Sequence, residues 1–186
     1  EWSVAGWLPL FLTQRLGISP ASSLRYLATY WLLVTLGRVV AQAILNRDVS
    51  HGKLLLGAGA GALLGAFILT STDNMFGVVS GLLFLSASFG LVHPLVLDRI
   101  SDRLPSLDPV YFHGIFSVAF PVALLAPAML GYLASYTSIA TVMYVPVLGS
   151  AIVFLLLLVV FIETRFLGMG DSAAGRDEDD SRESPP

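Results

Sequence analysis

Long apolar blocks are the feature that most constrains the fold of this chain. Residues 152–162 contain no polar side chain, and the next residue is Glu163. A helix of about 20 such residues crosses the hydrocarbon core of a bilayer, where only helices and closed barrels satisfy their backbone polar groups. Only 12% of the residues are charged, about half the fraction of a soluble domain. The sequence therefore predicts an all-α integral membrane protein.

Turn-forming residues divide the apolar sequence into six candidate transmembrane helices. Gly17 and Pro20 end the first block, and the sequence Ser-Thr-Asp-Asn at 71–74 separates the third block from the fourth. Pro105 and Pro109 precede the fifth block. The predicted spans are residues 1–16, 22–45, 53–70, 75–100, 110–135 and 139–166.

The end of the sequence differs sharply in composition from the rest. After residue 168 the chain is acidic and rich in Gly, Ser, Ala and Pro. Such a segment buries too little apolar surface to offset the entropy lost on ordering. We therefore predict a six-helix transmembrane region over residues 1–167 and a disordered acidic cytoplasmic tail over residues 168–186.

Basic residues are distributed unevenly between the two sides of the predicted helices. Arg15 and Arg25 lie on one side. The other side carries Arg47, Lys53, Arg99, Arg103, Arg165, Arg176 and Arg182. Because cytoplasmic loops carry the excess of Lys and Arg, we predict a multi-pass protein of the inner (plasma) membrane with a cytoplasmic C-terminus. The lipid bilayer is then its surroundings, and a net charge of −3 predicts no nucleic-acid partner.

The sequence lacks the motifs of common membrane enzymes. It has no cysteine, which excludes disulfides and thiolate metal sites. No His-Glu-x-x-His motif occurs, and His93 and His113 are too few ligands for a zinc site. Ser80 lacks the glycine two residues earlier that rhomboid-type hydrolases use. We predict no enzymatic activity, no cofactor and no metal. An intramembrane enzyme and a channel stay as alternatives, although no filter or charged ring is recognisable.

The predicted helices differ in how polar they are. The first, second, fourth and fifth spans contain polar residues or prolines, which usually face a bundle interior or a water-filled cavity. The third span carries Gly57, Gly61 and Gly65 at four-residue spacing, which predicts close packing against another helix. The sixth span is nearly all Val, Ile, Leu and Phe, so we expect it to be peripheral and to face lipid.

Several short segments resemble motifs of the major facilitator superfamily. Residues 37–47 (GRVVAQAILNR) and 51–53 (HGK) resemble its Gly-Arg…Asp-Arg…Gly-Arg/Lys loop, with Asn46 where the family pattern often has Asp. Residues 90–103 (GLVHPLVLDRISDR) are similar to the Gly…Pro…Ser-Asp-Arg run that ends its tenth helix. Residues 127–134 (PAMLGYLA) resemble the Pro-x-x-x-Gly-x-Leu-Ala motif that closes its eleventh helix.

The resemblance implies that the chain is the C-terminal half of a secondary transporter. In this superfamily each half contains two inverted three-helix repeats, and the substrate binds at the midplane between the halves. The chain begins within an apparent helix, so we expect a fragment whose partner is the missing N-terminal six-helix half. Residues 1–9 (EWSVAGWLP) resemble the seventh helix of the fucose permease-like branch, which implies a sugar-like small-molecule substrate and proton coupling. The alternatives are drug or metabolite efflux, and a stand-alone six-helix protein acting as a symmetric dimer.

Candidate binding residues are the polar and aromatic side chains within the predicted spans, because aromatic faces stack on sugar rings and polar groups bond hydroxyls. The candidates for substrate binding are Trp7, Gln14, Tyr30, Trp31, His93 and Ser117. For the aromatic residues the alternative is an interfacial belt or simple packing, and Gln14 near a span end favours an interfacial position. Glu1 and His93 are the candidate proton carriers, since histidine titrates near neutral pH and a buried carboxyl can do so. A structural bond beside Pro94 is the alternative for His93.

Charged residues near the predicted cytoplasmic turns are candidates for gating. They are Arg38, Arg47, Asp98 and Asp102. A guanidinium near a membrane face needs a partner or a route to water, so we expect Arg38 to pair with Asp98 or Asp102 and to latch the closed state. The alternatives are snorkelling of Arg38 to lipid phosphate and a local helix pair between Arg99 and Asp102.

Overall fold

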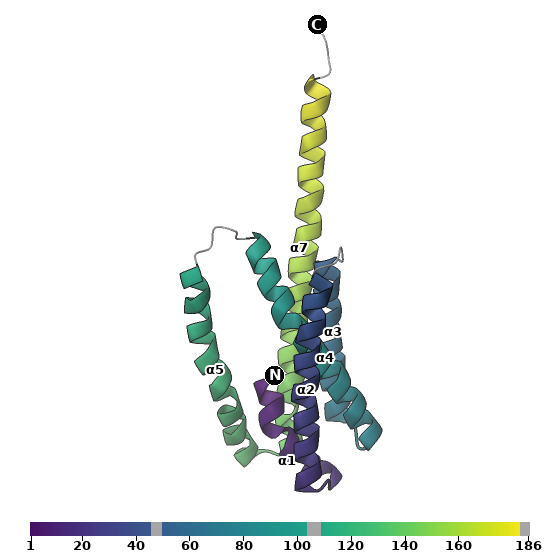
Figure 1. The fold of residues 1–186 in the computed structure, drawn as a ribbon, viewed down its shortest axis with the longest axis vertical. Coiled ribbons are helices and arrows are strands. Elements are labelled where there is room, and N and C mark those ends of the chain that lie inside the picture. The colour runs from purple at the N-terminus through teal and green to yellow at the C-terminus, as the bar shows by residue number, and fades with distance from the viewer. Residues whose placement is uncertain (46–49, 104–108, 183–186) are drawn as a thin grey trace.

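The computed structural model describes residues 1–45, 50–103 and 109–182, with side chains for 1–45, 50–100, 114 and 117–163. Every element in these ranges is a helix, which confirms the predicted all-α class (Figure 1). The helices are α1 (Trp2–Leu16), α2 (Pro20–Leu45), α3 (His51–Ser71), α4 (Met75–Arg103), α5 (Pro109–Tyr136), α6 (Ile139–Val142) and α7 (Tyr144–Arg182).

Five helical segments of the described chain are long and apolar enough to cross a membrane. They are Pro20–Leu45, His51–Ser71, Met75–Ile100, Ser117–Tyr136 and Ile139–Glu163. The helix α1 has 15 residues, fewer than the about 20 that span the hydrocarbon core. The arrangement is consistent with half of a major facilitator fold, as the sequence predicts.

The first two turns follow from local sequence. Gly17 adopts a left-handed conformation with φ 64°, which suits glycine, and its N–H donates to the Leu12 carbonyl to close α1. Between α3 and α4, Asn74 accepts a hydrogen bond from the Gly77 N–H at 2.8 Å and so caps the start of α4. The helix boundaries were therefore predictable from turn-forming residues.

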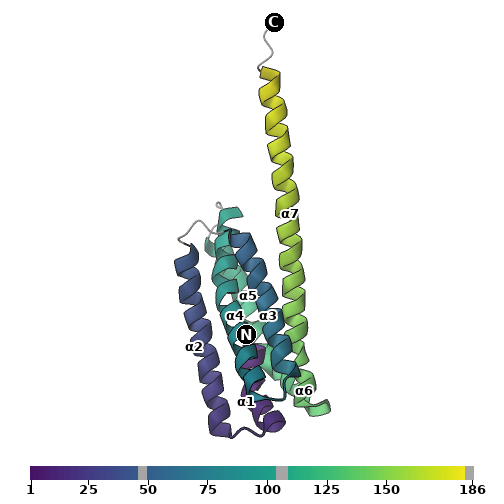
Figure 2. The same cartoon turned by 90° about the vertical axis from the view of Figure 1, so that its right-hand side faces the viewer.

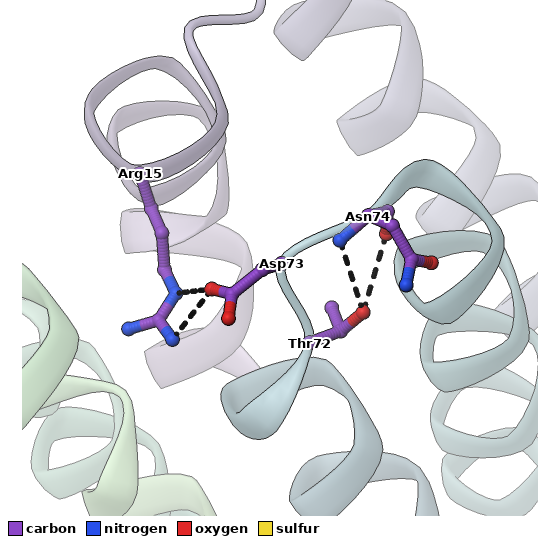
Figure 3. A network of polar contacts seen from close by, with 4 residues as sticks. All are labelled: Arg15, Thr72, Asp73 and Asn74. Atoms are coloured by element: carbon purple, nitrogen blue, oxygen red, sulfur yellow. Dashed lines mark hydrogen bonds and ion pairs between the residues drawn. The ribbon is translucent and has the colours of Figure 1, made fainter.

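A polar network fixes the α3–α4 turn to the end of α1 (Figure 3). The guanidinium of Arg15 lies 2.8 Å from an Asp73 carboxylate oxygen. Beside it, the Thr72 hydroxyl donates to the Asn74 carbonyl at 3.2 Å and accepts from its N–H at 3.3 Å. This end of the bundle is the one predicted to carry few basic residues, and its one described ion pair joins α1 to the α3–α4 turn.

Residues 139–163 of the last predicted span are long and apolar enough to cross a membrane, but they contain a break that was not predicted. The helix breaks at Met143, which separates α6 from α7. Pro146 has no N–H to donate to the Val142 carbonyl four residues earlier, and its ring crowds that carbonyl. The Thr70 hydroxyl of α3 donates to the Met143 carbonyl at 3.1 Å, so the break is also held by a tertiary contact.

Close backbone contacts join α4 to its two neighbours. Between α2 and α4, a Cβ on Gly90 would lie 2.6 Å from the Val34 carbonyl oxygen and 2.8 Å from the Gly37 Cα. Between α3 and α4, Gly61 and Gly65 lie against the backbone or side chains of α4, as their spacing predicted. Gly57 has no atom within 4 Å of such a Cβ, so it does not take part.

The core lies where α1, α2, α3 and α4 meet. Leu8 and Phe11 of α1, Tyr30 of α2, Leu69 of α3 and Leu85 of α4 are fully buried there. The helix α5 stands at the edge of the bundle, where it contacts α1 and α6 (Figure 1).

The helix α7 packs on α3 along one side and is exposed along the other. Ile152, Leu155, Leu156 and Val159 are each about 60% exposed, which fits the predicted lipid-facing position. The helical backbone continues to Arg182 and projects past the other helices (Figures 1 and 2). An isolated helix of this kind is marginal in water, so the disorder of residues 168–186 stays a prediction. Residues 183–186 lie outside the described residues.

Candidate transport cavity

A cavity of about 660 Å³ lies between α1, α3, α4 and α7. Its polar lining comes from Glu1, Ser3, His93 and Ser150. Most other lining residues are apolar, with Phe89 as the one aromatic side chain among the described lining residues. The structure thus brings the two predicted proton carriers, which are 92 positions apart in the sequence, to one cavity.

Glu1 forms an ion pair that joins the start of α1 to the last third of α2. The Arg38 guanidinium donates to a Glu1 carboxylate oxygen at 3.0 Å. The Glu1 side chain is 20% exposed and that of Arg38 is 47% exposed. The Tyr30 hydroxyl donates to the Glu1 backbone carbonyl at 3.3 Å. One cavity carboxylate is therefore matched by a cation on the neighbouring helix.

Three aromatic rings pack together beside Glu1, where α1 meets α2. Tyr30 is fully buried and meets Trp31 edge-to-face with ring centroids 5.4 Å apart. Trp2 meets Trp31 in the same way at 5.4 Å. None of these three residues belongs to the described lining of the cavity. The contacts favour packing around the α1–α2 junction, and substrate binding by Tyr30 and Trp31 stays a prediction.

Trp7 connects α1 to α5. Its indole N–H donates to the Pro127 carbonyl at 2.9 Å, and its ring lies over Gly131, where a Cβ would come within 2.9 Å. The Pro127–Gly131 motif therefore provides a flat surface and an acceptor for Trp7. This geometry favours the packing alternative for Trp7, and its role toward substrate stays a prediction.

The other two candidates for substrate binding lie elsewhere. Gln14 lines a separate cavity of about 520 Å³ with Arg15 and Ser135 at the far end of α1. Ser117 is exposed on α5 and does not belong to the described lining of the 660 Å³ cavity. Of the six candidates for substrate binding, His93 is the one that belongs to the described lining of that cavity. The described contacts do not bring the other five together with His93 at one site.

The charged residues proposed for gating pair differently from the expectation. Arg38 pairs with Glu1, whereas Asp98 has an oxygen 2.9 Å from Nδ1 of His51. Gly37 meets Gly90 at the α2–α4 contact, and Asp98 lies eight residues further along α4. That is about 12 Å along the helix, and each of the two residues has a different partner in the structure.

The remaining gating residues cannot be placed in the same way. Arg47 lies outside the described residues, and so does the side chain of Asp102. The roles of Arg38, Arg47, Asp98 and Asp102 in gating therefore stay predictions. Among the described side chains, Arg38 pairs with Glu1 and Asp98 pairs with His51, in place of the expected pair between Arg38 and Asp98.

Sequence reasoning missed His51 and Trp2 as partners within the bundle. His51 belongs to the HGK segment of the loop motif, so its position was noted without a role. Trp2 lies one residue from Glu1, but only the α1–α2 packing shows that it meets Trp31. Contacts between side chains far apart in sequence depend on how helices are rotated about their axes, which hydropathy does not report.

Comparison with known proteins gives one informative similarity. No protein-family model matches the chain. The chain is 25% identical over 140 residues to an uncharacterized MFS-type transporter of Yersinia pestis, where MFS denotes the major facilitator superfamily. The match covers 75% of this chain and 36% of that protein, so the chain spans about a third of its relative. This similarity supports a transport function in general terms.

Proposed function

We propose that this chain is the C-terminal six-helix half of a major facilitator transporter that moves a small solute by alternating access. The observation that carries this proposal is the 660 Å³ cavity lined by both Glu1 and His93. Its volume lies in the range of about 300–1,000 Å³ that small-molecule sites occupy. The similarity to an MFS-type transporter and the five apolar helices support it.

The proposed partner is an N-terminal six-helix half that closes the cavity from the opposite side. Alternating access then consists of rocking the two halves around a site at the bilayer midplane. In this arrangement the protein lies in the inner membrane with its C-terminus in the cytoplasm, as its basic turns predict.

Proton coupling would act through the Glu1–Arg38 pair. A proton on the Glu1 carboxylate removes the negative charge that holds the Arg38 guanidinium at 3.0 Å. Arg38 is then free to turn toward water or another acceptor, which loosens the contact between α1 and α2. His93 borders the same cavity and is the second proposed proton carrier.

A sugar is the leading substrate class. Glu1, Ser3, His93 and Ser150 offer acceptors and donors to hydroxyl groups, and Phe89 offers a flat apolar surface to a ring. One observation favours a second candidate, the efflux of an apolar solute. Most of the cavity wall is apolar, and such a wall binds hydrocarbon surface better than it binds hydroxyl groups.

The test is transport by the complete gene product in liposomes. Accumulation of a panel of small sugars is measured with and without an imposed pH gradient, beside efflux of an apolar dye. We expect gradient-driven accumulation of one sugar, lost in His93→Asn and kept in Ser80→Ala. Ser80 lies on the same helix, and its hydroxyl donates to the Phe76 carbonyl as its one described side-chain hydrogen bond, so it is a matched control.

Each outcome separates the candidates. Dye efflux without sugar uptake would replace the sugar proposal by efflux of an apolar solute. If folded protein shows neither sugar uptake nor dye efflux, the transport proposal is contradicted. Sugar uptake that is the same in His93→Asn and wild type would remove His93 from the mechanism and leave Glu1 as the carrier to test.

A further inference from the structure

A second cavity lies at the end of the bundle where α3 begins. It has a volume of about 440 Å³. Its walls are the first turn of α3 (residues 50–53), Arg99 of α4, and Leu157, Val160 and Phe161 of α7. We call it the α3–α7 pocket. It shares no lining residue with the 660 Å³ cavity, so it is separate from the proposed transport site.

The charge of the α3–α7 pocket is positive. Lys53 and Arg99 both line it, and no Asp or Glu belongs to its described lining. His51 also lines it, but Asp98 lies 2.9 Å from the His51 ring and offsets any charge on it. Lys53 and Arg99 form no ion pair among the described side chains, so their two charges are available to a ligand.

The start of α3 adds to this positive field. Its N-cap residue Ser50 makes no side-chain cap hydrogen bond, and its first turn contains no acidic residue. The N–H groups of a first turn have no partner within the helix and favour a nearby anion. The first turn of α3 forms part of the wall of the α3–α7 pocket, through Ser50, His51, Gly52 and Lys53.

The third wall is hydrocarbon-like and comes from the end of the apolar part of α7. Leu157, Val160 and Phe161 belong to the last part of the apolar run of α7, which ends at Glu163. The contact is close, since a Cβ on Gly52 would lie 3.5 Å from the Phe161 ring. Cations beside an apolar helix face at this depth match a phospholipid, whose phosphate and acyl chains need both surfaces.

We propose that the α3–α7 pocket binds the headgroup of an anionic phospholipid, with Lys53 and Arg99 at its phosphate. The acyl chains extend along the exposed face of α7, where Leu156 and Val159 are about 60% exposed. A free phosphate ion would use the cations and the α3 N-terminus but leave the apolar wall without a partner. The wall therefore favours a lipid as the source of the phosphate.

Native mass spectrometry of the detergent-solubilised complete gene product tests this proposal. Dioleoyl phosphatidylglycerol and dioleoyl phosphatidylcholine are titrated separately, so that the two probes differ only in headgroup. We expect the first phosphatidylglycerol to bind more tightly than phosphatidylcholine. Lys53→Gln and Arg99→Gln should each weaken phosphatidylglycerol binding about fivefold and phosphatidylcholine binding less, because the choline cation offsets the charge of its phosphate.

Arg25→Gln is the matched control. It removes the same charge from an exposed position at the start of α2, far along the sequence from the pocket. It should keep the phosphatidylglycerol affinity of wild type. The elution volume shows that each variant is folded, and Lys53→Gln changes an exposed side chain for which no hydrogen bond or ion pair is described.

Three results would overturn the proposal. The first is unchanged phosphatidylglycerol affinity in both Lys53→Gln and Arg99→Gln. The second is an equal loss in Arg25→Gln, which would mean that net charge acts and not the pocket. The third is displacement of the lipid by an equal concentration of inorganic phosphate, which would assign the site to a free anion.

Discussion

At the scale of single residues, Glu1 and Arg38 connect the cavity to helix packing. Glu1 lines the cavity and its side chain is one-fifth exposed, while the side chain of Arg38 on α2 is nearly half exposed. An ion pair this exposed contributes little to stability, since solvent screens it. Its significance would therefore lie in the change that follows when one charge is removed.

A double-mutant cycle tests whether the pair acts as a unit in transport. Glu1→Gln and Arg38→Gln should each lower the initial uptake rate about tenfold, which corresponds to about 1.4 kcal/mol in the barrier. The double variant should be no slower than either single variant, because both changes remove the same contact. Initial rates in liposomes, measured at one pH gradient, give the coupling between the two residues.

Arg25→Gln is the control for this cycle, since Arg25 is exposed at the far end of α2. It should transport at the wild-type rate. Multiplicative slowing in the double variant would show that Glu1 and Arg38 act independently, and the proposed release of Arg38 would then be wrong.

At the scale of elements, the α2–α4 contact depends on two glycines. Gly37 precedes Arg38 in the loop motif, and Gly90 begins the segment that resembles the end of a tenth helix. A Cβ on Gly90 would meet the backbone of α2 at 2.6 Å and 2.8 Å, and backbone atoms cannot rotate away as a side chain can. Both motif glycines thus have a packing reason, since they allow two helices to cross closely.

Gly90→Val is expected to force α2 and α4 apart. The cost should be about 1–3 kcal/mol, the range for overpacking a well-packed core. The measurement is the thermal unfolding midpoint of the detergent-solubilised complete gene product. Gly57→Ala is the control, because nothing lies within 4 Å of a Cβ there and alanine favours the helix. Equal midpoints for Gly90→Val and wild type would contradict the observed helix crossing.

At the scale of the whole molecule, two exposed helices differ in chemistry. The helix α5 contains Ser117, Pro121 and Pro127 and contacts α1 and α6. The spanning part of α7 is nearly all apolar and packs on α3. Exposure alone does not separate a helix that lines a water-filled pathway from one that faces lipid, but the polarity of the helices predicts these two environments.

Cysteine accessibility distinguishes these environments, because this chain has no cysteine of its own. Ser117→Cys should react with a water-soluble maleimide about tenfold faster than Leu155→Cys, since thiolates form in water and not in hydrocarbon. Ser117 is eight residues from the start of α5, and Leu155 is eight residues before Glu163. Labelling is measured in membranes of a cysteine-free parent.

Reaction in denaturant is the control for this comparison, because both cysteines should then react at the same rate. Slow labelling of both positions in membranes would show that this face of α5 lies against lipid or the other half. Fast labelling of both would contradict the lipid-facing position of α7.

The sequence by itself determined the class of protein, the approximate limits of its helices and the packing role of Gly61 and Gly65. These follow from local patterns, since apolar length, turn-forming residues and small-residue spacing act within one helix. The break at Met143 was also encoded locally, by Pro146, but it was not predicted.

Only the tertiary structure decided which charges meet. Arg38 and Glu1 are 37 positions apart, and their pairing depends on how α1 and α2 pack against each other. The same holds for the gathering of Glu1 and His93 around one cavity and for the meeting of Lys53 and Arg99 in the α3–α7 pocket. Hydropathy fixes how deep a residue lies, but the rotation of each helix about its axis is set by packing against its neighbours.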